Sequence, residues 1–133
     1  MRTHLLSALA TLKIGMDILT ETEQVHIDRL YGHGGFFKTP EVGQRMLSAA
    51  VGVPVSVMKT AGEGGPYGMA LLGAYMLWHE EGESLPDYLD NKVFADAQSS
   101  TVSATQEDID GFNAFLAQYR KALPLERLAT EML

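Results

Sequence analysis

Apolar residues recur at helical spacing from the start of the chain. They occupy positions i, i+4, i+7, i+11 and i+14 of one stripe: Leu5, Leu9, Leu12, Met16 and Leu19. Residues three or four positions apart lie on the same face of an α-helix. The pattern therefore predicts an amphipathic helix over about residues 2–19 that buries this stripe.

Two extended apolar runs follow, and each leads into a glycine-rich turn and then into a helical pattern. Residues 25–32 predict a strand that runs into the first glycine turn (residues 32–40), and residues 54–58 predict a strand before the second glycine turn (residues 62–68). Strands that alternate with helices favour βαβ units and parallel pairing. We expect an α/β fold whose short, mostly parallel sheet is flanked by helices.

The helix after the first turn has clear end signals. Thr39 is a good N-cap, Pro40 suits the first helical position, and Glu41 adds negative charge to the first turn. Gly52 is a residue type that ends helices in the left-handed conformation. The inward positions are predicted to be Val42, Met46 and Ala49 or Ala50 in this helix, and Met69, Leu72, Gly73, Met76 and Leu77 in the next.

The pattern is weakest over residues 82–105. Residues 85–94 predict a short helix, and residues 97–105, rich in serine and threonine, predict a loop. Thr105 then caps a helix over residues 106–122, with Asp108 completing a capping box, and Pro124 is expected to break it. The predicted buried stripe is Phe112, Phe115, Tyr119 and Leu123, and a last short helix would carry Leu125, Leu128 and Leu133.

Composition narrows the classes of function. Hydrophobic residues make up 46% of the chain and charged residues 20%, which are values of a globular domain. Seventeen acidic against ten basic residues give a net charge of −7, which argues against nucleic-acid binding. The absence of cysteine excludes thiolate chemistry, and no signal peptide or membrane-spanning stretch is visible. We expect a cytoplasmic protein whose methionines and aromatic residues form its core.

The two turns offer free N–H groups at helix N-termini, which suit a phosphorylated ligand. The first turn nearly matches a P-loop, with Gly32, Lys38 and Thr39 in register, but Phe37 stands where the second glycine belongs. Neither turn contains G-x-G-x-x-G, since Phe37 and Tyr67 occupy the place of the third glycine. Both motifs are therefore rejected.

Two interpretations of the turns remain. Gly34 and Gly35 in one turn, with Gly64 and Gly65 in the other, either line a nucleotide cleft at one sheet edge or make ordinary strand-to-helix turns. The neighbouring side chains share this ambiguity. Lys38 either reaches a phosphate or is solvated, His33 either touches a ligand or packs on the loop, and Glu63 either bonds a ribose or a metal-bound water or caps a helix. His79-Glu80-Glu81 is not H-E-x-x-H, and no metal site is expected.

Several short segments stand together at a recognisable spacing: GGFFKTP at 34–40, Gln44, GVPV at 52–55, GEGGP at 62–66 and GMALLGA at 68–74, with YRKAL at 119–123 and ER at 126–127. Their spacing resembles that of the C-terminal domain of FGGY carbohydrate kinases, and most of all the pentulose kinases of the xylulokinase and ribulokinase type. Phe36 and Phe37 depart from the Gly-Ala that is commoner in the family.

The resemblance implies one half of an actin-like ATPase fold of the ribonuclease H-like kind, with ATP in a cleft between two domains. Gly34 and Gly35 would approach the phosphates or ribose, with Lys38 and Thr39 nearby, and Gly64 and Gly65 would flank the adenine. The implied nucleotide-binding residues are Gly34, Gly35, Phe36, Lys38, Thr39, Glu63, Gly64 and Gly65.

The expected function is therefore that of the C-terminal domain, over residues 1–133, of a kinase that phosphorylates a ketopentose with ATP and Mg²⁺. In the family the sugar site and the catalytic aspartate lie in N-terminal segments, so we expect a fragment that is inactive alone and carries no catalytic residue. An apolar face normally covered by the other domain would allow a homo-dimer. The alternative is a non-catalytic actin-like module that binds a nucleotide or a partner protein.

Overall fold

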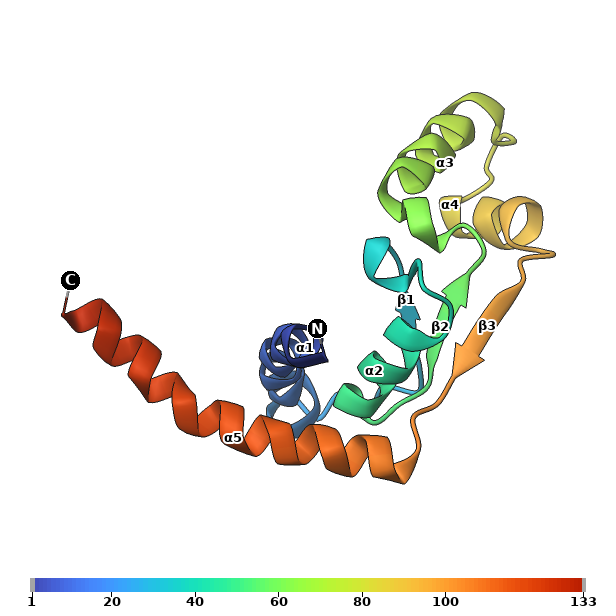
Figure 1. Ribbon diagram of the computed structural model, residues 1–133. Coiled ribbons are helices and arrows are strands. Elements are labelled where there is room, and N and C mark those ends of the chain that lie inside the picture. Colours follow the sequence, from blue (N-terminus) through green and yellow to red (C-terminus); the bar gives the residue numbers. More distant parts are fainter. Residues whose placement is uncertain (1, 133) are drawn as a thin grey trace.

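The computed structural model describes residues 2–132, with the backbone alone at Glu63, and shows helices around a three-stranded sheet (Figure 1). The helices and strands are α1 (Arg2–Asp17), β1 (Leu30–Gly32), α2 (Val42–Val51), β2 (Val55–Met58), α3 (Gly64–Trp78), α4 (Leu85–Tyr88), β3 (Ser99–Val102) and α5 (Gln106–Glu131). Short helical turns lie at η1 (Ile18–Thr22), η2 (Gly35–Phe37), η3 (Ala61–Glu63) and η4 (Leu89–Val93). The predicted α/β class is confirmed.

The sheet has the strand order β1-β2-β3 and is mixed. Strands β1 and β2 are parallel, with Leu30 beside Val55, whereas β2 and β3 are antiparallel, with Val55 beside Val102. The mostly parallel prediction was wrong because residues 97–105 contain a strand and not only a loop. β3 pairs with one side of β2 and is largely exposed. Its backbone hydrogen bonds to β2 make it a strand, and its sequence lacks the apolar alternation by which a strand is normally predicted.

β1 is shorter than the predicted strand over residues 25–32. Only residues from Leu30 onward pair with β2, and residues 25–29 approach the sheet without joining it. Apolar residues in this approach are partly exposed, as Val25 is at 46%. The apolar run therefore predicted the presence of the strand and overestimated its length.

The core forms where α1, α2 and α5 meet the sheet. Figure 1 shows α1 and α2 side by side, with the first half of α5 crossing both, and contacts join all three pairs of helices. The buried residues of this core are Leu9, Ala10, Leu47, Ala49, Ala50, Val55, Phe112 and Leu116. The stripe predicted for α1 was partly wrong, because Leu12 and Leu19 are 43% and 44% exposed, whereas Leu6 and Ile14 pack against the core.

Asp17 links α1 to α5. Its carboxylate accepts a hydrogen bond from Arg120 Nη2 over 2.6 Å and forms an ion pair with Lys13 one turn earlier on α1. The Asp17 side chain is only 12% exposed, so both cations compensate a carboxylate that is largely removed from water. The pairing joins α5 to the C-terminal end of α1.

The helix ends that the sequence predicts are confirmed in part by the structure. Gly52 ends α2 as predicted, with φ of 80° and an N–H that donates to Ser48 O over 2.8 Å. Thr105 and Asp108 form the predicted capping box. Thr39 is not the N-cap of α2, because the helix begins at Val42 and Arg45 N–H donates to Glu41 O as its first turn.

Several predicted inward positions are exposed. Val42 is 47% exposed and Leu123 38%, while Met46 is half-buried. The largest deviation is α3, none of whose described side chains is buried. Its outer residues are exposed to between 46% and 77%: Met69, Leu72, Met76, Leu77 and Trp78. The prediction that these residues form core was wrong, since α3 packs only through its half-buried side.

α4 and η4 confirm the predicted short helix over residues 85–94. They pack under α3, where the rings of Tyr75 and Tyr88 meet edge to face at 5.4 Å. Tyr75 also donates its hydroxyl to Glu83 O over 2.7 Å. These contacts fix the inner side of α3 to the segment that follows it.

α5 continues through Pro124 to Glu131, so the predicted break at this proline was wrong. Figure 1 shows the second half of the helix extending away from the rest of the molecule. Its apolar residues there are exposed, Leu125 to 68% and Leu128 to 53%, and Leu133 lies outside the described residues. Across residues 2–132 no helix combines the length and the apolar character needed to cross a membrane.

Candidate nucleotide site at the glycine turns

The parallel pairing of β1 and β2 brings the two glycine turns together. Each turn follows the carboxyl end of its strand, and parallel strands place these ends at one edge of the sheet. A hydrogen bond joins the turns directly, from Gly34 N–H to Ala61 O over 2.6 Å. The expectation that residues about thirty positions apart meet at the same sheet edge is correct.

Side chains of the first turn also lie on glycines of the second. A Cβ placed on Gly64 would come within 2.9 Å of His33 Cβ and 3.1 Å of His33 Nδ1, so the histidine packs on the residue that opens α3. The stem of Lys38 passes Gly62 with its Cε 3.6 Å from a Cβ placed there. The absence of a side chain at Gly64 therefore allows the two turns to approach each other, whereas a Cβ at Gly62 would meet Lys38 at an ordinary contact distance.

Three glycines leave open backbone at this junction. At Gly34, Gly35 and Gly65 no atom lies within 4 Å of the position that a Cβ would take. Gly34 also has φ of 95°, a conformation that side chains rarely adopt. Gly65 lies in the first turn of α3, where backbone N–H groups have no partner within the helix. The N–H of Gly34 already donates to Ala61 O, so an anionic group would approach the backbone at Gly35 in the first turn and at Gly65 in the second.

The two phenylalanines turn inward under the first turn. The rings of Phe36 and Phe37 meet edge to face at 5.2 Å and both pack against the core. A Cβ on Gly32 would lie 2.6 Å from Phe37 Cε1, and a Cβ on Gly43 would lie 2.6 Å from Phe36 O. The half-buried ring of Phe36 is thus occupied mainly by packing, and the inward ring of Phe37 is consistent with rejection of the P-loop.

The remaining predicted site residues lie around the same junction. Lys38 and Thr39 are exposed in the bend between η2 and α2. Glu63 ends η3, directly before the first residue of α3, and its side chain lies outside the described part of the structure. The structure thus brings Gly34, Gly35 and Gly64 together, and it leaves the role of the Glu63 carboxylate open.

Two hollows flank the turns and were not apparent from the sequence. One, of about 300 Å³, lies beside Phe37, Pro40 and Gln44, and the other, of about 220 Å³, lies beside Tyr67 and Phe94. Lys59 lines both. They combine residues from β2, α3 and the approach to β3, so no single stretch of sequence could have revealed them.

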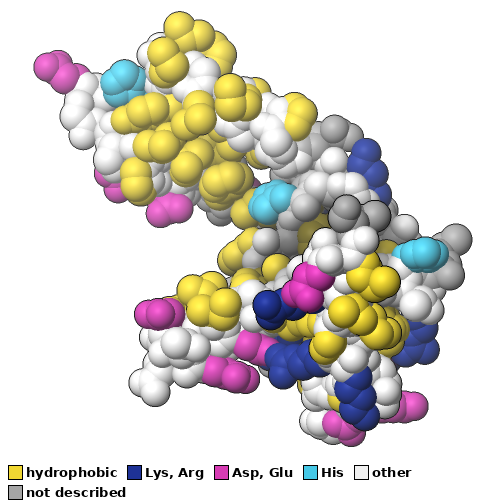
Figure 2. Space-filling view, turned by 90° about the vertical axis from the view of Figure 1, so that its left-hand side faces the viewer, with side chains coloured by type: hydrophobic (Ala, Val, Ile, Leu, Met, Phe, Trp, Pro, Cys, Tyr) yellow, Lys and Arg dark blue, Asp and Glu magenta, His cyan; other side chains and the backbone are white. Residues whose placement is uncertain are grey.

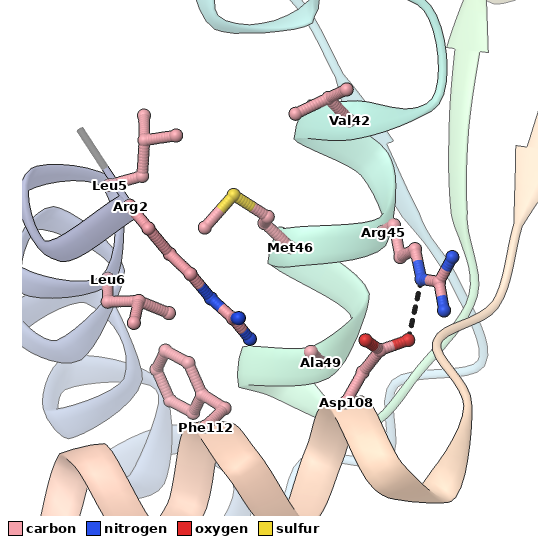
Figure 3. A pocket seen from close by; sticks show the side chains of 9 residues that line it. All are labelled: Arg2, Leu5, Leu6, Val42, Arg45, Met46, Ala49, Asp108 and Phe112. Atoms are coloured by element: carbon pink, nitrogen blue, oxygen red, sulfur yellow. Dashed lines mark hydrogen bonds and ion pairs between the residues drawn. The ribbon is translucent and has the colours of Figure 1, made fainter.

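A larger hollow, a groove of about 550 Å³, lies between α1, α2 and α5 (Figure 3). Its apolar lining includes Leu6, Met46 and Phe112, and the ion pair of Arg45 with Asp108, at 2.6 Å, lies at its rim. The groove lies beside the core of the three helices and its lining contains none of the glycine-turn residues. It therefore belongs to a different part of the surface.

Charged groups near α3 form a surface network and not a metal site. Lys92 Nζ donates to Glu80 over 2.8 Å and to Glu83 over 3.0 Å. A hydrogen bond from the backbone N–H of Glu80, together with Lys92, lowers the pKa of Glu83, and hydrogen bonds to Glu80 and Glu83 raise the pKa of Lys92. Among the side chains that the structure describes, which exclude that of Glu63, no three histidine or acidic groups lie together as metal ligands would.

The comparisons with known proteins give one result. Residues 1–77 match the C-terminal domain of the FGGY family of carbohydrate kinases, a stretch that includes α1, both glycine turns and almost all of α3. No curated protein and no solved structure matches the chain. Because the match spans 77 of the 133 residues and contains both turns, the chain belongs to the FGGY family of carbohydrate kinases, as its C-terminal domain.

Proposed function

We propose that the two glycine turns form one wall of the ATP site of a sugar kinase. The observation that carries this proposal is the Gly34 N–H to Ala61 O hydrogen bond, which joins the turns and places them beside the open positions of Gly35 and Gly65. Phosphoryl transfer depends mainly on positioning and on stabilising charge, and backbone N–H groups at a helix start contribute to both. Membership of the FGGY family supplies the reaction class.

Each candidate residue has a distinct part in this proposal. Gly34 and Gly35 approach the phosphates or ribose with their backbone, with Phe36 adding only its main chain. Gly64 and Gly65 flank the adenine at the start of α3. Lys38 and Thr39 would contact phosphate oxygens, and Glu63 would contact the ribose or a metal-bound water.

Mg²⁺ enters the proposal with the nucleotide. The residues that the structure describes contain no cluster of three metal-ligating groups, so the ion would be held by the phosphates and by groups beyond this set. When bound, Mg²⁺ neutralises charge on the transferred phosphoryl group. This domain would contribute backbone N–H groups and the Lys38 ammonium group to the stabilisation of that phosphoryl charge.

The proposed substrate is a ketopentose of the xylulose or ribulose type, and the proposed location is the cytoplasm. The support is the resemblance of the two glycine motifs, at their spacing, to pentulose kinases. We assign neither a sugar contact nor a catalytic base to residues 2–132, so phosphorylation is proposed for the intact kinase and not for this domain alone. Partners are ATP and, through the remainder of the kinase, the sugar.

A non-catalytic actin-like module is the second candidate. The exposed apolar face of α3 is consistent with it, since an interaction module needs such a face. In that case the turns would bind a nucleotide without transferring its phosphate.

Calorimetric titration of ATP into the purified chain, with and without Mg²⁺, tests the nucleotide site. We expect saturable binding that Gly35→Val abolishes, because Gly35 has open space and the added side chain would occupy the path of the ligand. In the intact kinase the same substitution should raise the KM for ATP more than the KM for the sugar. Equal effects on both constants would indicate a folding role and contradict the assignment.

A further inference from the structure

The smaller of the two hollows beside the glycine turns lies at the carboxyl end of β2. Its lining comes from three parts of the chain that are distant in sequence: Lys59 and Thr60 after β2, Tyr67 on α3, and residues of the segment 93–98 that leads into β3. Its volume is about 220 Å³, whereas sites that enclose a drug-sized ligand measure roughly 300–1,000 Å³. The hollow therefore has room for a ring system and not for a whole nucleotide.

Two aromatic side chains line the hollow, and both are half-buried. Tyr67 comes from the start of α3, the helix whose hydrophobic side chains gather over the upper part of the molecule in Figure 2. Phe94 ends η4, where its N–H donates to Leu89 O over 2.8 Å. Phe94 O accepts from Ala97 N–H over 3.0 Å, which closes the turn that carries Asp96. These bonds fix the backbone that presents Phe94 and Asp96 to the hollow.

Polar side chains beside the two rings are available to a ligand. Thr60, Asp96 and Gln98 are exposed, and in the part of the chain that the structure describes none of these side chains has a hydrogen-bond or ion-pair partner. An ionised carboxylate only accepts hydrogen bonds, and the exocyclic amine of adenine only donates them. Nucleobases also stack on aromatic side chains. The hollow thus combines the two kinds of contact that recognise an adenine ring.

One wall of the hollow lies outside the part of the chain that matches the FGGY family. The match ends at residue 77, so it includes Tyr67 but neither Phe94 nor Asp96. The glycine motifs do not include these two residues either. A role for Phe94 and Asp96 must therefore be argued from their place in the fold.

We propose that the adenine ring of the nucleotide occupies this hollow, packed against Tyr67 and Phe94, with the Asp96 carboxylate accepting a hydrogen bond from the exocyclic amine. The proposal rests on the ATP site proposed at the glycine turns, since the open position of Gly65 lies two residues before Tyr67 on α3. It adds Phe94 and Asp96 to the nucleotide contacts. Recognition of the base then depends on a segment that follows the family match.

Calorimetric titrations with ATP and with inorganic tripolyphosphate separate contacts to the base from contacts to the phosphates. Phe94→Ala should raise the Kd for ATP by about fivefold or more, because it removes a ring on which the base stacks. It should leave the Kd for tripolyphosphate unchanged. Phe115→Ala is the matched control, because Phe115 is also half-buried but lies on α5, outside the lining of the hollow. It should change neither constant, and circular dichroism shows whether both variants fold.

Asp96→Ala provides a second variant that does not depend on packing. Removal of a carboxylate from a chain of net charge −7 would by itself favour an anionic ligand, so a role limited to charge predicts tighter ATP binding. Loss of the bond to the amine predicts the opposite, a Kd raised by about threefold or more. Asp90→Ala is its control, because Asp90 is exposed on η4 and does not line the hollow. It should not weaken ATP binding.

The outcomes separate this base site from the site at the glycine turns. If the wild-type chain binds ATP, equal affinity in Phe94→Ala, an equal loss in Phe115→Ala, or tighter binding by Asp96→Ala would overturn the base site alone. A wild-type chain that binds no ATP would overturn the proposed function together with it.

Discussion

The buried side-chain amide of Gln44 on α2 donates a hydrogen bond of 3.0 Å to the backbone carbonyl of Val55 on β2. The same nitrogen donates to Ser100 O on β3 over 2.9 Å. In return, the Ser100 hydroxyl donates to Gln44 Oε1 over 3.4 Å. One amide thus connects α2 to two strands of the sheet. It holds the helix that leads out of the first glycine turn against the strand that leads into the second.

Replacement of this amide should destabilise the domain. Gln44→Leu keeps the volume but leaves the carbonyls of Val55 and Ser100 without this donor, at a cost of about 1–3 kcal/mol. Urea unfolding followed by circular dichroism measures the change. Gln118→Leu is the control, because Gln118 is exposed on α5, and its effect should stay within about 0.5 kcal/mol. Equal losses from both substitutions would rule out the special role of Gln44.

Gly32 is predicted to be required for packing and not for nucleotide contact. Gly32→Ala places a methyl group 2.6 Å from Phe37 Cε1, and Phe37 cannot move freely because it packs against Phe36 and the core. Overpacking of this kind costs about 1–3 kcal/mol. Gly35→Ala, where the added methyl meets open space, should be much milder. Thermal unfolding of the two variants compares them, and a Gly35→Ala loss as large as that of Gly32→Ala would contradict the packing described for the turn.

Acid stability should depend on Asp108. A hydrogen bond from Arg45 and further bonds from Thr105 lower the pKa of Asp108 below its ordinary value of 3.8. The unfolded chain then binds a proton more readily than the folded chain, so the contribution is fully present above pH 3.8 and is lost as pH falls through the lowered pKa. Melting temperatures measured from neutral to acid pH should fall less steeply for Asp108→Asn than for wild type.

A matched control for this acid dependence is Asp90→Asn. Asp90 is exposed on η4, so this variant should follow the wild-type profile. Parallel profiles for wild type and Asp108→Asn would mean that the Arg45 and Thr105 contacts do not persist in solution.

Much of the fold could be predicted from local signals. Gly52 and Thr105 were identified as helix ends because each acts through its own backbone or its nearest neighbours, and the structure confirms both. The strand before the second turn and the helix over residues 85–94 also follow from local pattern. The meeting of the two glycine turns follows from the parallel pairing that alternating strands and helices imply.

The errors have non-local causes. β3 is polar and is held by pairing with a strand about forty residues earlier, including a 2.7 Å bond between Ser56 Oγ and Thr101 Oγ1. Pro124 leaves α5 helical, although a proline removes one backbone donor. Phe36 and Phe37 could be identified as departures from a glycine motif, but their inward packing depends on Gly32 and Gly43, which only the folded chain brings beneath them.

The central claim is that the paired turns bind ATP, and backbone amide NMR of the ¹⁵N-labelled chain during an ATP titration tests it most directly. The chain has a mass of 14.5 kDa, which suits residue-by-residue detection even of weak binding. We predict concentration-dependent shifts at the amides of Gly34, Gly35, Gly64 and Gly65, with Gly82 and Gly111 unaffected. Absence of shifts at the turns at saturating ATP, or shifts confined to the groove beside Phe112, would contradict the account.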